Sequence, residues 1–176
     1  MSSELGEQSD LVGELSREVR WISARSVLFS HLASERAGLR PTDLEALDIL
    51  ALTGPIPAGR LAALTGLSTG SVTALIDRLE AAGCARREPD PADRRRVIVQ
   101  PLPWPAAMAE AVQPLYEAMG AGFEALCRQY RDEELTLILE FLRGANSMGA
   151  TAIFQAQERS AAARRSGTAA DREDGG

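Results

Sequence analysis

The chain has 176 residues, of which 45% are hydrophobic, and its formal net charge is −6 at pH 7. This length suits one ordinary domain, and because no apolar run is long enough to span a bilayer, we expect a cytoplasmic protein. The cysteines, Cys84 and Cys127, lie far apart and have no companions at metal-ligand spacing, so we expect no disulfide framework, metal or other cofactor.

Residues 1–37 are predicted to contain a long helix that takes part in dimerisation, beginning near Asp10 after a polar, frayed start. Apolar residues recur at helical spacing on one side: Leu11, Leu15, Val19, Ile22, Phe29 and Leu32. A second apolar set, Trp21, Val27 and Leu28, lies on another side. A helix that is apolar on two sides packs against two partners. In a chain of this size, we expect the second partner to be another copy of the chain.

Residues 38–102 are predicted to form three helices and a β-hairpin. Pro41 suits the first turn of the first helix, and two shorter helices follow at 58–65 and from residue 69, with a tight turn between them. Ser68 can cap the last of these helices, and Gly83 stands just past its end. This helix is therefore bounded at both ends.

A basic hairpin is predicted after Gly83. Two short extended runs, 84–87 and 96–100, are joined by a loop that contains two prolines and is expected to protrude. Three consecutive arginines, Arg94, Arg95 and Arg96, stand on its return side. A helix-turn-helix followed by a basic hairpin predicts a winged helix.

Charge is distributed unevenly along the chain. Between residues 60 and 100, seven arginines face five carboxylates, so this segment carries about +2 and the remainder about −8. The chain has no lysine, so every cationic contact except one histidine must come from arginine, which favours bidentate recognition of phosphate and guanine. This separation suits a DNA-binding face on an acidic body.

Residues 103–156 are predicted to form two more helices of the dimerisation region. The first begins near Pro105 and is expected to kink at Pro114, and the second begins near Asp132. Bulky apolar residues are almost absent from 157–176, so this segment is predicted to be a disordered tail. The domain boundaries expected from the sequence are 1–37, 38–102, 103–156 and 157–176.

The chain resembles the MarR-like family of winged helix-turn-helix transcriptional regulators in two adjacent segments, LAALTGLSTGSVTALIDRLEAAG and REPDPADRRRVIV. The resemblance implies an all-α fold with a small β-hairpin wing and a helical dimerisation region. It also implies a homodimer that binds a pseudo-palindromic double-stranded DNA operator. We expect a repressor that a small aromatic effector releases from DNA.

The residues expected to bind DNA lie on the second short helix and on the wing. On the helix they are Ser68, Thr69, Ser71, Thr73 and Arg78, which can approach base edges and phosphates. On the wing, Asp93-Arg94-Arg95 resembles the Asp-x-Arg signature of the family, which implies that Asp93 orients Arg95 into the minor groove. Arg94 and Arg96 are then the expected phosphate contacts. Family members often carry an arginine where this chain has Ala74, so its hydroxyl residues and DNA shape must supply more of the specificity.

Two other functions are weighed against DNA binding. Winged helices also occur as protein-binding modules without DNA binding, but a solvated turn needs only polarity, so a cluster of arginines at its tip favours DNA. An enzyme is not expected, because the chain shows no nucleophile motif, no phosphate-binding loop and no metal-ligand spacing.

An effector pocket is a further hypothesis. Its candidate residues are Trp21, Phe29, His31 and Trp104, on the assumption that they converge in space. The alternative is a constitutive regulator in which the aromatic residues belong to the core and His31 borders it.

Overall fold

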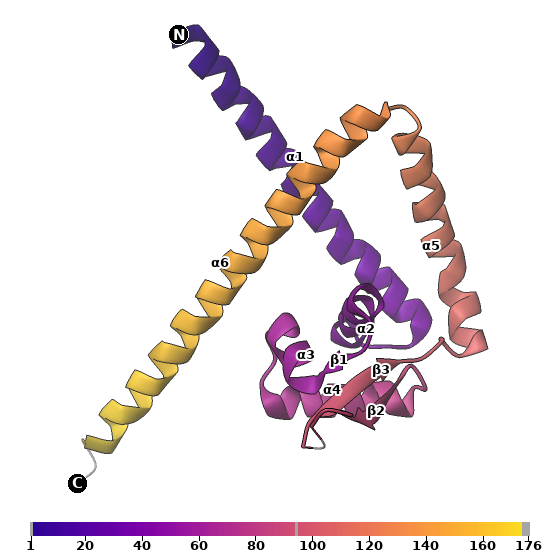
Figure 1. Ribbon diagram of the computed structural model, residues 1–176, viewed down its shortest axis with the longest axis vertical. Helices are drawn as coiled ribbons and strands as arrows, with labels where there is room; N and C mark the ends of the chain where they lie inside the picture. The colour runs from indigo at the N-terminus through magenta and orange to yellow at the C-terminus, as the bar shows by residue number, and fades with distance from the viewer. Residues whose placement is uncertain (1, 94, 174–176) are drawn as a thin grey trace. The chain divides into compact units, whose positions relative to one another are not determined.

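The computed structural model describes residues 2–93 and 95–173, which form two compact units that divide between Glu117 and Ala118 (Figure 1). The first unit contains α1 (Ser2–Ala37), α2 (Pro41–Thr53), β1 (Ile56–Pro57), α3 (Ala58–Thr65), α4 (Thr69–Ala81), β2 (Ala85–Pro89), β3 (Val97–Pro101) and the first half of α5 (Ala106–Cys127). The rest of α5 and α6 (Asp132–Glu173) make up the second unit. The helices α2, α3 and α4, followed by the hairpin of β2 and β3, confirm the predicted winged helix.

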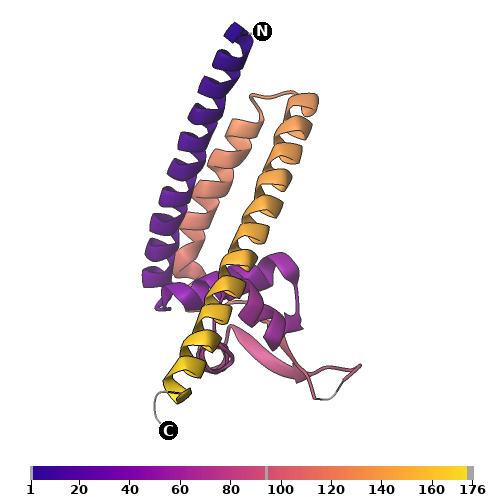
Figure 2. The same ribbon diagram turned by 90° about the vertical axis from the view of Figure 1, so that its left-hand side faces the viewer.

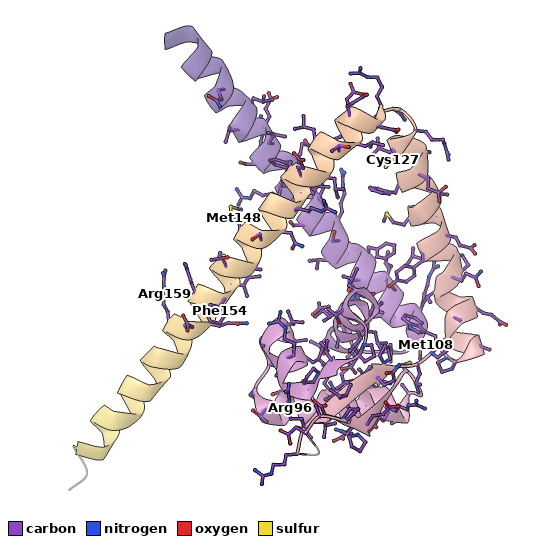
Figure 3. The ribbon with its side chains drawn as sticks, viewed as in Figure 1. Arg96, Met108, Cys127, Met148, Phe154 and Arg159 are labelled. Carbon is purple, nitrogen blue, oxygen red and sulfur yellow. The ribbon has the colours of Figure 1, made fainter. Side chains whose placement is uncertain are left out.

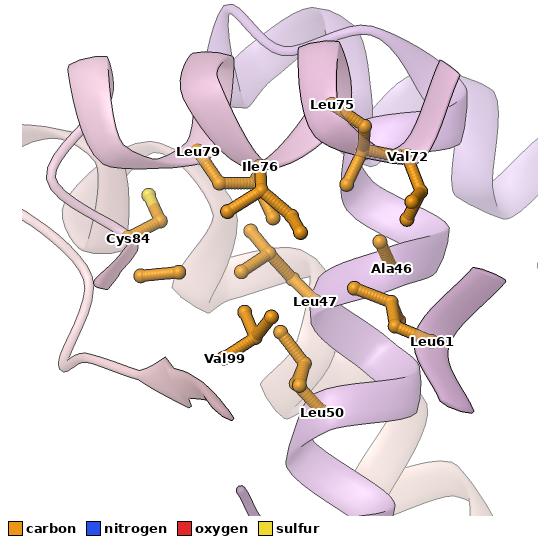
Figure 4. Packing of buried hydrophobic residues seen from close by; sticks show 11 residues of the cluster. Ala46, Leu47, Leu50, Leu61, Val72, Leu75, Ile76, Leu79, Cys84 and Val99 are labelled. Atoms are coloured by element: carbon orange, nitrogen blue, oxygen red, sulfur yellow. The ribbon is translucent and has the colours of Figure 1, made fainter. Parts of the chain in front are cut away.

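The core of the first unit lies between α2, α3, α4 and β3 (Figure 4). From α4 it receives residues at spacings of three and four, which place them on one face of the helix: Val72, Leu75, Ile76 and Leu79. They pack against Leu47 and Leu50 of α2, Leu61 of α3 and Val99 of β3. Burial of each of these leucines stabilises the fold by about 2 kcal/mol.

The ends of α4 form as predicted. The Ser71 backbone N–H donates to Ser68 Oγ at 3.2 Å, which satisfies an otherwise unpaired donor of the first turn. Gly66 and Gly83 have φ values of 71° and 73°, a conformation in which a side chain would be strained. These two glycines therefore allow the tight turns before and after α4.

The sheet has the antiparallel order β1-β3-β2. Arg87 of β2 and Ile56 of β1 both lie opposite Val99. The strand β1 was not expected, because two residues are too few to show an alternating pattern. The hairpin strands begin one residue later than the sequence predicts, at Ala85 and Val97, and end one or two residues later.

Two helices are longer than the sequence predicts. Helix α1 already begins at Ser2, and α6 runs on to Glu173 where 157–176 is predicted to be disordered. The lack of bulky apolar residues removes a reason to pack but not the helix propensity, because the segment is rich in alanine and arginine and has no proline. Helix α5 continues through Pro114.

Apolar side chains remain exposed on the long helices of each unit. On α1 they include Leu11, Leu15, Ile22 and Leu28. On α6 they include Leu137, Phe141, Leu142, Met148 and Phe154, of which the last two are labelled in Figure 3. Within the described part of the chain, none of the helices has both the length and the apolar character that crossing a bilayer requires.

Candidate nucleic-acid interface

Helix α4 presents an exposed face of small residues and hydroxyl groups. Thr69, Ser71 and Thr73 are all exposed, as is the capping Ser68. Ser68 Oγ and Ser71 Oγ share a hydrogen bond of 2.9 Å, and Thr73 Oγ1 donates to the Thr69 carbonyl at 2.9 Å. The Thr73 hydroxyl has therefore used its proton within the helix and offers acceptor lone pairs to the outside.

Arg78, an expected DNA contact, has a structural partner within the winged helix. Its Nε and one terminal nitrogen donate to the two carboxylate oxygens of Asp43 in α2, at 2.8 and 2.5 Å, and its other terminal nitrogen donates to the Ala74 carbonyl. The hydrogen bond with Asp43 raises the pKa of the Arg78 guanidinium. Because Asp43 is only 2% exposed, this pair ties α4 to α2 at a buried carboxylate.

Two aspartates shape the tip of the wing. Asp93 Oδ1 accepts from the Arg95 backbone N–H at 3.0 Å, and the Asp93 carbonyl accepts from the Arg96 N–H at 2.8 Å. Asp90 Oδ1 accepts from the Ala92 N–H at 2.8 Å, and the Asp90 N–H donates to the Arg96 carbonyl. These bonds hold a compact turn, which projects from the sheet in Figure 2. Asp93 thus acts on the backbone that carries Arg95.

The arginines of the interface differ in how far they are neutralised. Arg95 at the wing tip is exposed, and within the described residues it has no ion-pair partner; the same holds for Arg60 at the start of α3. Arg96, labelled in Figure 3, lies 3.8 Å from Asp90 and is 57% exposed. Arg94 lies outside the described residues. Arg95 is thus the described arginine of the wing whose charge is not balanced by a carboxylate among the described residues.

Arg87 on β2 is a residue that sequence reasoning missed. Its guanidinium pairs with Asp77 at 2.6 Å and with Glu80, both on α4. Asp77 and Glu80 are three residues apart on one helix face, which is the signal that could have pointed to a cationic partner. Arg86, the preceding residue, pairs with Glu88 of its own strand.

An aromatic junction joins α1, α2 and α5 within the first unit. Phe29 and Trp104 meet Tyr116 edge to face, with ring centroids 5.3 and 6.4 Å from that of Tyr116. The Tyr116 hydroxyl donates to Asp48 Oδ1 at 3.5 Å. Burial, followed by the negative charge of Asp48, raises the pKa of Tyr116 to about 12. Burial also raises the pKa of Asp48.

Only part of the expected effector pocket comes together. Phe29 and Trp104 share Tyr116, which the sequence did not single out, whereas Trp21 is 57% exposed and stacks on Arg25. His31 is exposed beside Glu35 at 3.5 Å. Trp21 and His31 do not join this cluster. Trp21 lies about 12 Å along the helix axis from Phe29, and the two-residue step from Phe29 to His31 turns the side chain by about 200° around the helix.

Comparison with known proteins decides the family. Residues 37–96, which contain the helix-turn-helix and most of the wing, match the model of the MarR family. The uncharacterized HTH-type transcriptional regulator YcgE of Bacillus subtilis is 49% identical over 123 residues, which cover 70% of this chain and 78% of the relative. The chain belongs to the MarR family. Members of the MarR family are transcriptional regulators and not enzymes, so this chain is a DNA-binding regulator.

Solved structures of MarR-like proteins share the fold. The transcriptional regulator Tm0710 from Thermotoga maritima is 26% identical, with a TM-score of 0.52, and the match covers 77% of this chain and 93% of that one. NadR in complex with 4-hydroxyphenylacetate is 22% identical, with a TM-score of 0.51, and the match covers 72% and 89% of the two chains. At this identity the second likeness concerns the fold alone.

Proposed function

We propose that this MarR-family protein is a repressor that binds a pseudo-palindromic operator as a homodimer. The observation that carries the proposal is that one compact unit presents two features suited to DNA, the exposed hydroxyl face of α4 and the exposed Arg95 at the projecting wing tip. A helix of this kind fits the major groove, and an arginine on a wing fits the narrow minor groove beside it.

The homodimer is proposed from the exposed apolar faces. The exposed apolar faces on α1, α5 and α6 would promote nonspecific association of a monomer. A second copy with the same faces can cover them. Two α4 helices then approach half-sites whose centres lie about 34–36 Å apart, one turn of B-DNA. The twofold symmetry of the protein is matched by an inverted repeat.

Selection of bound sequences from a random duplex library tests this proposal. We expect enrichment of one inverted repeat, because each protomer must meet an equivalent half-site. If the purified protein enriches no sequence and shows no salt-sensitive shift of any duplex, the winged helix is a protein-binding module and the proposal fails.

Arg95→Ala tests the wing. We expect it to weaken binding to the selected duplex and to reduce the slope of log affinity against log salt by about one unit for each phosphate contact that is lost. The control is Arg128→Ala, just after the end of α5, which removes the same charge from an arginine that faces Glu124. Equal salt slopes for wild type and Arg95→Ala would contradict the wing assignment.

Release by an effector is the second part of the proposal, and it rests on the aromatic junction. Phe29, Trp104 and Tyr116 supply edge-to-face partners for an aromatic ring, and Asp48 supplies a polar partner. The probes are 4-hydroxyphenylacetate and related phenols, screened by thermal shift and by loss of the DNA complex. A ligand should stabilise the protein and lower its DNA affinity by a few kcal/mol at most. If no compound does both, the regulator is constitutive.

A further inference from the structure

Arg87 attaches strand β2 of the wing to α4 through both its side chain and its backbone. The guanidinium contacts the carboxylates of Asp77 and Glu80 and donates to the Thr73 carbonyl at 3.1 Å. The Arg87 backbone N–H donates to Glu80 Oε1 at 2.7 Å. One residue of β2 is therefore bonded to α4 over a length of two turns.

These contacts restrain orientation as well as distance. A planar guanidinium that is bonded along several edges has one allowed orientation, which a single point charge would not impose. The Arg87 side chain is 28% exposed, so its bonds are partly shielded from water. Arg86, on the opposite face of the same strand, pairs with Glu88 of β2 at 2.5 Å, so its ion pair does not link the strand to α4.

The same contacts neutralise the acidic residues of α4. Asp77 and Glu80 are the two carboxylates of this helix, and Asp77 is 61% exposed. Close to a duplex, unpaired carboxylates repel phosphates and disfavour binding. Arg87 thus acts on the charge of α4 as well as on the angle between α4 and the wing.

We propose that Arg87 is a positioning residue for DNA binding. It holds the wing at one angle to α4, so that Arg95 and the hydroxyl face of α4 meet the same duplex together, and it cancels the charges of Asp77 and Glu80. This inference rests on the DNA-binding function proposed above. Arg87 itself touches no phosphate.

The test compares Arg87→Met, which keeps an apolar stem and removes the ion pairs, with Arg87→Lys and with the matched control Arg86→Met. Affinity is measured on the duplex that the wild type selects. We expect Arg87→Met to bind about tenfold more weakly, a change of the size that coupled contacts produce, with Arg87→Lys intermediate and Arg86→Met close to wild type. Circular dichroism confirms that each variant is folded.

A double-mutant cycle with Arg95→Ala separates positioning from direct contact. If Arg87 positions the wing, Arg95→Ala costs less affinity in the Arg87→Met background than in the wild type, because the wing no longer presents Arg95. Additive losses, together with a salt slope that falls by about one unit in Arg87→Met, would show that Arg87 contacts a phosphate itself and would overturn the proposal.

Hydrogen exchange on the free protein keeps this inference distinct from the proposed function. Arg87→Met is expected to speed exchange of backbone amides in β2 and β3 while those of α2 keep their wild-type rates. Unchanged exchange in the sheet would overturn the positioning role whether or not DNA binds. Faster exchange in a protein that selects no duplex would support the positioning role and reject the DNA-binding function.

Discussion

At the scale of single residues, the arginines of the winged-helix unit fall into two groups, those paired with protein carboxylates and those left exposed. Arg78 and Arg87 are held by carboxylates of neighbouring elements, whereas Arg60 and Arg95 are exposed and have no ion-pair partner among the described residues. A guanidinium suits both kinds of partner, because its fork binds a protein carboxylate and a DNA phosphate with the same geometry. The carboxylates within reach therefore decide which arginines are left for the proposed contact with DNA.

Arg78→Met is expected to destabilise the protein by about 3 kcal/mol, because it leaves the buried carboxylate of Asp43 without a cation. The free energy of unfolding in urea measures this loss. Arg86→Met is the control, since the exposed pair of Arg86 with Glu88 contributes about 0.5 kcal/mol or less. An equal loss of unfolding free energy in the two variants would show that the pair between Arg78 and Asp43 stabilises the fold no more than an exposed ion pair does.

Local patterns predicted the exposed hydroxyl groups and the arginines of the wing, because helical spacing and turn composition depend on nearby residues. They did not predict the partner of Arg78, since Asp43 is 35 positions away in the sequence. Asp43 also had a sufficient local explanation, as an acidic residue in the first turn of a helix. Long-range pairs of this kind require the packing of α2 against α4 to be known.

At the scale of elements, Tyr116 connects the first half of α5 to its neighbours. It meets Phe29 of α1 and Asp48 of α2, and the first unit ends one residue later, at Glu117. Sequence periodicity did not single out Tyr116, because a residue that is 36% exposed lies between the buried and the solvent-facing sides of its helix. Periodicity predicted the helices well, whereas the two-residue β1 was too short for any pattern to reveal.

A pH titration tests this connection. The pKa of Tyr116 is raised from 10.0 to about 12, so the folded state keeps its proton where the unfolded state loses it. The resulting stabilisation is complete below pH 10 and is lost as the pH rises through 12. Screening of a side chain that is 36% exposed reduces it to about 1 kcal/mol.

The measurement is the ultraviolet absorbance of tyrosinate in the wild type minus that in Tyr116→Phe, which isolates the ionisation of Tyr116. We expect the difference to have its midpoint near pH 12. A midpoint near 10.0 would show that Tyr116 is solvated and does not lie against Asp48.

At the scale of the whole molecule, the exposed apolar faces determine the expected assembly. Light scattering at micromolar concentration should give twice the chain mass of 18.8 kDa. Leu142→Glu on α6 is expected to raise the dimer dissociation constant about a hundredfold, because it places an unpaired charge in the proposed interface. Leu52→Glu on α2 is the control, since Leu52 is 87% exposed and lies outside that interface. A monomer mass for the wild type would contradict the dimer.

The strand order β1-β3-β2 leaves β2 at an edge of the sheet. Unpaired backbone groups on an edge strand can recruit a strand from another molecule and so begin aggregation. β2 is only five residues long, carries the charges of Arg86 and Glu88, and ends in Pro89, which has no N–H to donate. These features discourage strand addition between molecules. Protection of this edge therefore keeps the wing free for the proposed contact with DNA.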